Sequence, residues 1–306
     1  MAYIYSDFVN RDSQLHGLRV AIGQPQSRFV LIEGQKGMGK TFMLKEFHSG
    51  IGKIGMKGVY IDLSDTIQGY LDIIYQVPRQ IGRHGFEKLI QTMKDLDRKF
   101  ENSAKSPHEI SARLGSIPAQ SSVDAGSVGA EGRSGGIDIA QGDLNAPFSQ
   151  IAGRDLYYVV NVIYMGNKHD RDLIRLDTTN AFLECLSSYD PNARFCLLID
   201  HWESANEETR SWIFDHLVLW ALNGQIPGVL LVIACDCKPG WSEERTDISC
   251  MKIPRLPNEA VRSYWVNIKE LPVEVLEKNN YFFGNPLLMT TYAQVLKKEK
   301  IGAVSG

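Results

Sequence analysis

The chain has 306 residues, 43% of them hydrophobic and 23% charged. This composition is typical of a globular protein with a substantial core and excludes a chain that is disordered overall. The formal net charge of −3 provides no large basic field, so electrostatics do not indicate a nucleic-acid partner. No apolar stretch approaches the ~20 residues that span a bilayer, and residues 1–10 lack a secretion signal's basic start and apolar core, so we expect a cytoplasmic protein without a membrane partner.

The first predicted strand is the short apolar run of residues 29–32, and a glycine-rich loop follows it directly. Residues 34–41 read Gly-Gln-Lys-Gly-Met-Gly-Lys-Thr, which matches the pattern G-x4-G-K-[S/T] of a phosphate-binding loop. Apolar residues then recur at helical spacing over residues 40–49. Strand, loop and helix in this order are the context that a phosphate-binding loop requires, and an ordinary glycine-rich turn is the disfavoured alternative.

The residue types of this loop suit a polyphosphate. The glycines permit left-handed backbone angles that turn N–H groups inward, and the following helix N-terminus adds its dipole. Lys40 is predicted to reach the β- and γ-phosphates, and the Thr41 hydroxyl is predicted to be a ligand of Mg²⁺. Met38 is expected to be a filler. The predicted nucleotide-binding residues of this segment are Gly34, Gln35, Lys36, Gly37, Met38, Gly39, Lys40, Thr41 and Phe42.

A second strand is predicted at residues 59–63, followed by two or three helices within residues 66–100. Glycine, serine and alanine dominate residues 101–150, which indicates an insertion; a disordered insertion is favoured over a functional loop. Residues 156–164 are β-rich, but their polar flanks fit a hairpin or an edge strand as well as a core strand.

The second half of the chain alternates helices and buried strands. The predicted elements are a helix at 171–188, a strand at 194–200, a helix at 207–222, strands at 228–235 and 249–253, and a helical remainder at 257–300. Continuous apolar strands that alternate with helices predict an α/β fold, in which a parallel sheet is sandwiched by helices and a small C-terminal helical lid follows.

Asp200 ends a buried strand, and functional residues of parallel α/β sheets lie at the carboxyl ends of the strands. An ionised group after five apolar residues needs a partner or water, so we predict that Asp200 holds Mg²⁺ through water. Glu203 is predicted to orient or deprotonate the attacking water; its alternative is an acid that complements a helix dipole. With Lys40, these two residues are the candidate catalytic set. His201 is expected to pack or to form hydrogen bonds rather than to catalyse.

Four segments together resemble the STAND branch of the AAA+-related P-loop ATPases, which includes NACHT and apoptotic-type switch proteins. Residues 8–15 resemble the N-terminal F-x-x-R-x-x-x-L signature, residues 34–41 match Walker A, and residues 197–203 resemble Walker B. Residues 284–286 match the G-x-P motif of the helical lid.

The resemblance implies a nucleotide-binding core at residues 1–255, a helical lid at residues 256–306, and ATP or ADP with Mg²⁺ as cofactors. It adds Arg11 and Pro286 to the nucleotide-binding residues, with the proline near the adenine.

One departure from the family pattern concerns the residue after the fourth core strand, where members usually carry an Arg that senses the γ-phosphate. Asp236 stands there instead, and an acid cannot stabilise transferring phosphoryl charge, so turnover is expected to be slow or to use an Arg from a neighbouring subunit. Candidate arginines are Arg210, Arg245 and Arg255. An Arg from a neighbouring subunit would imply a homo-oligomer. Because the chain ends soon after the lid, we expect either separate sensor or effector chains or a nucleotide core that acts alone.

Three classes of function follow. The favoured class is an ATP-binding switch with slow, Mg²⁺-dependent hydrolysis. The second is a nucleotide-binding interaction module that hardly turns over. The third is a small-molecule or nucleotide kinase, for which residues 62–100 show no arginine-rich lid; a DNA-loading ATPase is a weaker branch whose signature is salt-dependent DNA binding.

The five cysteines, an odd number, show no paired metal-ligand spacing. Cys196 and Cys235 lie in apolar runs and are predicted to be buried thiols. A redox or metal site at Cys235 and Cys237 is the less favoured alternative.

Overall fold

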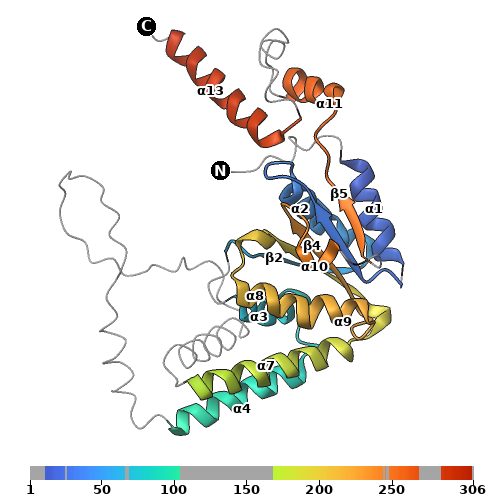
Figure 1. Cartoon of the computed structure of the whole chain (residues 1–306), viewed down its shortest axis with the longest axis vertical. Helices are drawn as coiled ribbons and strands as arrows, with labels where there is room; N and C mark the ends of the chain where they lie inside the picture. The colour runs from blue at the N-terminus through green and yellow to red at the C-terminus, as the bar shows by residue number, and fades with distance from the viewer. Residues whose placement is uncertain are drawn as a thin grey trace, which may run out of the picture. The chain divides into compact units, whose positions relative to one another are not determined.

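The computed structural model describes residues 11–24, 26–65, 69–103, 168–243, 245, 248–268 and 284–304 (Figure 1). The predictions for Phe8, for residues 156–164 and for nearly all of the insertion lie outside these residues. The chain divides into two compact units, the first formed by residues 1–87 and 182–306 and the second by residues 88–181.

The centre of the first unit is a parallel sheet of five strands in the order β2-β3-β4-β1-β5 (Figure 1). The strands are β1 (Phe29–Glu33), β2 (Lys57–Asp62), β3 (Phe195–Asp200), β4 (Val229–Cys235) and β5 (Ser249–Lys252). Every residue of β3 and β4 is buried, as a central strand covered on both faces requires. The predicted α/β fold with a parallel sheet between helices is confirmed.

The register of the sheet brings the carboxyl ends of its strands to one edge. Asp62 pairs with Asp200 across β2 and β3, and Glu33 pairs with Cys235 across β1 and β4. Residues that follow these positions therefore share that edge, although they lie far apart in the sequence.

Side chains that alternate along the strands pack against two helices on one face of the sheet. Those helices are α1 (Asp12–Gly23) and α2 (Lys40–Ile51), which contribute Leu18 and Met43 to a core cluster that also contains Leu198. On the other face lie α3 (Tyr70–Ile81), α8 (Glu207–Trp212) and α9 (Leu219–Leu222), as Figure 1 shows.

Residues 207–222 are helical without a break, as predicted. The middle of this helix, Ile213–Val218, is π-helical and lies between α8 and α9. The side chain of Asn206 caps its start by accepting a hydrogen bond from the Thr209 N–H at 2.8 Å. Trp212 faces the core and stacks on Tyr70 of α3, with ring centroids 4.9 Å apart.

The short helix α10 (Gly240–Glu243) follows β4, and 3-10 turns cover Gly52–Ile54, Pro191–Ala193 and Trp202–Ser204. After β5 the described chain is helical, as predicted, in α11 (Asn258–Ser263), a π-helical segment (Tyr264–Ile268) and α13 (Pro286–Val304).

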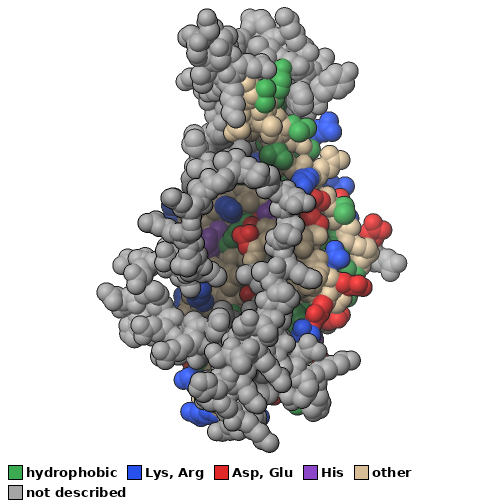
Figure 2. Space-filling model, turned by 90° about the vertical axis from the view of Figure 1, so that its left-hand side faces the viewer, with side chains coloured by type: hydrophobic (Ala, Val, Ile, Leu, Met, Phe, Trp, Pro, Cys, Tyr) green, Lys and Arg blue, Asp and Glu red, His purple; other side chains and the backbone are tan. Residues whose placement is uncertain are grey.

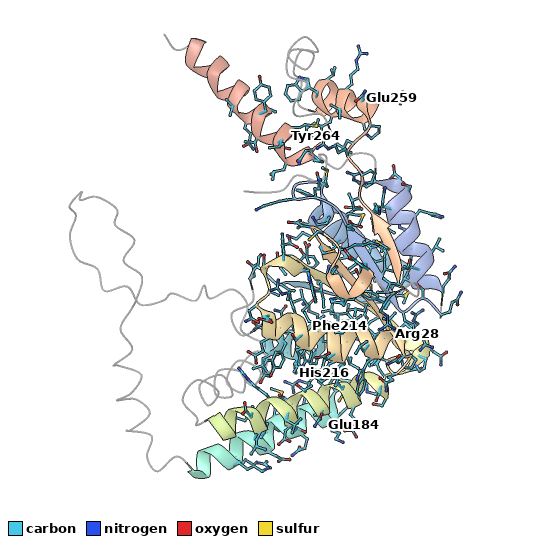
Figure 3. The ribbon with its side chains drawn as sticks, viewed as in Figure 1. Arg28, Glu184, Phe214, His216, Glu259 and Tyr264 are labelled. Carbon is cyan, nitrogen blue, oxygen red and sulfur yellow. The ribbon has the colours of Figure 1, made fainter. Side chains whose placement is uncertain are left out.

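These C-terminal helices have a small core of their own, made of Leu256, Ala260, Val261, Tyr264 and Met289. Tyr264, labelled in Figure 3, joins the π-helical segment to α13, because its hydroxyl lies 2.5 Å from that of Thr290.

Two helices, α4 (Glu87–Ser103) and α7 (Lys168–Ser187), contain the described residues of the second unit, which are residues 88–103 and 168–181. Leu89, Leu96 and Ile174 are buried within it, and the Thr178 hydroxyl donates to the Ile174 carbonyl at 2.7 Å. No helix in the described part of the chain is long and apolar enough to cross a membrane.

Candidate nucleotide-binding site

The glycine-rich loop connects β1 to α2, as the sequence predicts. Gly37 and Gly39 have φ angles of +85° and +89°, in the left-handed region where L side chains are strained. Gly39 stands immediately before the first residue of α2, and no side chain caps this helix. The helix N-terminus therefore offers backbone N–H groups at the end of the loop, which suits an anion.

Lys40 lies buried inside this loop, with 7% of its side chain exposed. Its ammonium donates to the carbonyl oxygen of Gly34 at 2.5 Å and lies 3.4 Å from that of Gln35. The same ammonium forms an ion pair with Asp236, 2.6 Å from Oδ1. A buried ammonium needs an anionic partner, and a phosphate oxygen has the charge to replace this carboxylate.

Asp200 is completely buried at the end of β3, and both of its carboxylate oxygens accept hydrogen bonds. The backbone N–H of His201 donates to Oδ1 at 2.9 Å, and the hydroxyl of Tyr60 donates to Oδ2 at 2.9 Å. Burial and the neighbouring Asp200 raise the pKa of Tyr60 far above its usual range, so the hydroxyl keeps its proton. The partner that a buried carboxylate requires is thus supplied by β2 and by the residue that follows Asp200.

His201 connects three elements at this edge of the sheet. Its Nδ1 lies 2.7 Å from Oδ1 of Asp62 at the end of β2, and its Nε2 lies 3.4 Å from the Thr41 hydroxyl on α2. We expected His201 to pack or form hydrogen bonds, and in the structure it forms hydrogen bonds. No role was predicted for Asp62, although it ends a strand just as Asp200 does.

Asp62 is held in its ionised form by its surroundings. Burial alone would raise its pKa, but hydrogen bonds from the Ser64 hydroxyl and backbone N–H, and the contact with His201, lower the pKa below its ordinary value.

Glu203 lies in the 3-10 turn after β3, with an exposed side chain. Its Oε2 accepts a hydrogen bond from the backbone N–H of Asp236 at 3.3 Å. Asp236 thereby contacts Glu203 through its backbone and Lys40 through its carboxylate. Figure 2 shows basic, acidic and histidine side chains close together near the centre of one face of the molecule.

Three successive carbonyls of the loop accept hydrogen bonds from outside it. Arg11, only 3% exposed, donates to the Met38 carbonyl at 3.1 Å and to the Pro254 carbonyl at 2.9 Å. The Asn285 amide donates to the Lys36 carbonyl at 3.1 Å, and the Leu287 N–H donates to the Gly37 carbonyl at 3.2 Å. The start of α13 is therefore attached to the loop by two hydrogen bonds.

The remaining predicted residues differ in their exposure. Met38 is 2% exposed and belongs to the core cluster under α1 and α2, which suits a filler. Pro286 is the first residue of α13, next to Asn285. The guanidinium of Arg11 is engaged by carbonyl oxygens, and burial lowers its pKa from the ordinary value. Phe42 is half-buried on α2, and Gln35 and Lys36 lie at the surface of the loop.

The three arginines considered for phosphate sensing lie on different segments. Arg210 is on α8, Arg245 lies between α10 and β5, and Arg255 precedes α11. A role for any of them in a neighbouring subunit stays a prediction.

The residues at the sheet edge fit Mg²⁺ by their chemistry. Thr41 and Asp200 offer oxygen donors, which Mg²⁺ prefers, and Mg²⁺ in nucleotide sites is held by one or two such groups together with phosphate oxygens. Among the described residues, no three His, Cys, Asp or Glu side chains are arranged to hold a metal on their own. A metal at this edge would therefore depend on a bound nucleotide for its other ligands.

No protein-family model matches the sequence, and no curated protein matches it. Among solved structures, the chain is similar to the Orc1 protein of Aeropyrum pernix in complex with DNA, with a TM-score of 0.44 and 9% identity over 95% of this chain and 61% of that chain. It is also similar to a chain of Drosophila ORC bound to DNA, with a TM-score of 0.36 and 12% identity over 88% of this chain and 49% of that chain. This chain thus spans less than two thirds of either neighbour. The strand order of the parallel sheet and the helices on its two faces define the α/β fold of this chain.

Proposed function

We propose that the protein is a Mg²⁺-dependent ATP- and ADP-binding switch of the STAND or AAA+-related kind. It hydrolyses ATP slowly and couples nucleotide state to assembly, either as a homo-oligomer or with separate sensor or effector chains. The observation that carries this proposal is the buried Lys40 ammonium. It lies in the loop between β1 and α2, whose Gly37 and Gly39 have left-handed backbone angles, and it forms an ion pair with Asp236 after β4.

In this proposal each residue has a physical role. The loop N–H groups and Lys40 bind the phosphates, and Thr41 and Asp200 hold the metal, which neutralises phosphate charge when bound. Glu203 orients or deprotonates the attacking water. The helical segment 256–306 acts as a lid, with Pro286 near the base, and Arg11 supports the loop from outside by its bond to the Met38 carbonyl.

The hydrogen bonds between α13 and the loop support the coupling of nucleotide to assembly. A phosphate that rearranges residues 36–38 would alter the partners of Asn285 and Leu287. A switch needs two arrangements that the ligand distinguishes by its contacts, and this attachment provides a physical link between them.

Isothermal titration of ATP and ADP tests the binding site. Lys40→Ala should weaken nucleotide binding by about 100-fold or more, because a charge-assisted contact of roughly 3 kcal/mol is lost. Lys53→Ala removes an exposed lysine of the 3-10 turn after α2 and serves as the control, with affinity unchanged. Undiminished ATP affinity in Lys40→Ala would contradict the proposal.

The second candidate, an interaction module that binds nucleotide without turnover, is favoured by the acid at position 236. Phosphate release at saturating Mg-ATP separates the two candidates. A switch with slow hydrolysis shows release that falls in Glu203→Gln, whereas a module shows equally little release in both proteins.

The oligomeric state in ATP and in ADP tests the coupling to assembly. We expect the oligomeric state, measured by light scattering on the purified chain, to differ between ATP and ADP. Identical oligomeric states would contradict the coupling to assembly and would leave only the nucleotide-binding part of the proposal. Phosphate transfer to a small-molecule acceptor would support the kinase alternative. Salt-dependent DNA binding would support the DNA-loading alternative.

A further inference from the structure

His201 has an unusual backbone conformation. Its φ angle is +56°, the only positive value among the non-glycine residues that the structure describes. A left-handed conformation is strained for a residue with a Cβ, so surrounding contacts must hold it there. Two contacts do so, namely the hydrogen bond from its N–H to Asp200 and the contact of its imidazole with Asp62.

Burial does not explain why an imidazole stands at this position. One third of the His201 side chain is exposed, whereas the Asp200 side chain that precedes it is completely buried. The imidazole lies between a strand-end carboxylate and a helical hydroxyl, and both neighbours are polar. Its hydrogen bonds are therefore the property that distinguishes it from an apolar side chain of similar size.

The contact with Asp62 fixes which imidazole nitrogen carries the proton. The Asp62 carboxylate also accepts from the Ser64 hydroxyl at 2.6 Å and from the Ser64 N–H at 3.0 Å, so it acts purely as an acceptor. It therefore requires a proton on Nδ1 of His201, 2.7 Å away. In the neutral ring Nε2 is then an acceptor, and the hydroxyl of Thr41 donates to it across 3.4 Å.

We infer that His201, oriented by Asp62, is a positioning residue that directs the oxygen lone pairs of Thr41 toward Mg²⁺ in the nucleotide-bound protein. This inference rests on the proposed function. A hydroxyl whose proton is engaged by Nε2 presents its lone pairs elsewhere, which is the orientation that a metal ligand needs. The same residue holds Asp200 through its backbone N–H, so one residue orients both metal-side groups.

Two substitutions at position 201 distinguish the role of Nδ1 from the role of Nε2. His201→Asn retains an amide N–H near the place of Nδ1 and tolerates a left-handed backbone, but it has no acceptor at the place of Nε2. His201→Gln extends to that place and supplies an amide oxygen as acceptor. Asp62→Asn leaves the imidazole in place and removes only the carboxylate that orients it.

The measurement is ADP and ATP binding by isothermal titration, in EDTA and across a series of Mg²⁺ concentrations. In EDTA all variants should bind within about twofold of the unaltered protein, because Lys40 and the loop are intact. His201→Asn should need about 10-fold more Mg²⁺ for half of the metal-dependent gain in affinity, the size of effect typical of groups that orient metal ligands. His201→Gln should need less Mg²⁺ than His201→Asn, and Asp62→Asn should show a smaller shift in the same direction.

The possible results separate this inference from the proposed function. Unchanged Mg²⁺ dependence in His201→Asn overturns the inference and leaves the proposed function standing. A loss of nucleotide binding in EDTA also overturns it, because His201 would then support the loop rather than the metal ligand. If the unaltered protein binds nucleotide without any Mg²⁺ dependence, the metal part of the proposed function fails first. Should both position-201 variants lose their circular-dichroism melting transition, Asp62→Asn decides the inference by the same Mg²⁺ shift.

Discussion

The ammonium of Lys40 and the carboxylate of Asp236 form an ion pair of 2.6 Å, which joins the residue predicted to bind phosphate to an acid 196 positions further along the chain. The lysine side chain is 7% exposed and the aspartate side chain 28% exposed. Water can therefore solvate the aspartate more than the lysine, and the lysine charge depends more strongly on the ion pair. A phosphate that uses Lys40 must displace this carboxylate or accept its repulsion. The carboxylate of Asp236 therefore competes with a bound phosphate for the ammonium of Lys40.

Asp236→Asn should raise the affinity for Mg-ATP by about tenfold, equivalent to roughly 1.4 kcal/mol, because the competing charge is removed. Without nucleotide, the same variant should be less stable by about 1–3 kcal/mol, since the buried ammonium loses its charged partner. Titration calorimetry and urea unfolding measure the two effects.

The control for this variant is Glu259→Gln, which makes the same change of net charge at an exposed position of α11 (Figure 3). It should alter neither quantity. An Asp236→Asn protein with weaker ATP binding would mean that the carboxylate helps nucleotide binding instead of opposing it.

The elements around Lys40 could be predicted because their signals are local. Residues 29–32 are apolar, residues 34–41 combine three glycines with Lys-Thr, and Asp200 follows a buried run; each signal needs only neighbouring positions. The strands that were predicted from these runs agree with the structure within two residues at each end.

The partners of these residues could not be predicted, because they depend on how distant segments meet. His201 contacts Thr41 across 160 positions, and Asn285 contacts Lys36 across 249 positions. A strand-end acid such as Asp62 is visible in the sequence, but its importance depends on the register that places β2 beside β3. Single-sequence patterns do not specify this register.

Asn285 both caps α13 and attaches it to the loop, and two substitutions separate these functions. Its Oδ1 accepts from the N–H groups of Leu287 and Leu288 at 3.1 and 3.2 Å, while its amide N–H₂ donates to the Lys36 carbonyl. Asn285→Asp should keep the cap and lose the hydrogen bond to the Lys36 carbonyl, one of the two that attach α13 to the loop. Asn285→Ala should lose both the cap and that hydrogen bond and cost about 1 kcal/mol of helix stability.

Limited proteolysis with and without ATP measures this effect. If the hydrogen bond from Asn285 to Lys36 transmits the nucleotide state, both variants should show a smaller ATP-dependent change in cleavage of α13, and Asn285→Ala should also be cleaved faster without ATP. An ATP-dependent pattern that persists undiminished in both variants would show that α13 responds through other contacts.

Asp62 should make the stability of the first unit depend on pH in the acid range. Its folded-state pKa is lowered, so the native state binds fewer protons than the unfolded chain near the ordinary pKa of an aspartate. The stability that it contributes is present above the unfolded pKa and is lost as the pH falls through the folded pKa. The stability difference between the unaltered protein and Asp62→Asn should therefore shrink as the pH is lowered from about 6 to about 3.

Urea unfolding across this pH range provides the measurement, and Asp65→Asn, an exposed acid in the turn after β2, is the control. A stability difference for Asp62→Asn that stays constant with pH would contradict the assigned hydrogen bonds from Ser64 and His201.

The cysteines at the end of β4 should differ sharply in reactivity. Cys235 is buried, burial raises the pKa of its thiol to about 12, and its Sγ donates to the Ile32 carbonyl at 3.5 Å. At pH 8 only about one thiol in ten thousand is then the reactive thiolate, whereas Cys237 is exposed. Iodoacetamide followed by peptide mass spectrometry should modify Cys237 and leave Cys235 unmodified until urea is added, and Cys237→Ser should abolish the fast modification. Equal modification of both cysteines in the folded protein would revive the redox or metal alternative for this pair, because that chemistry needs both thiols accessible.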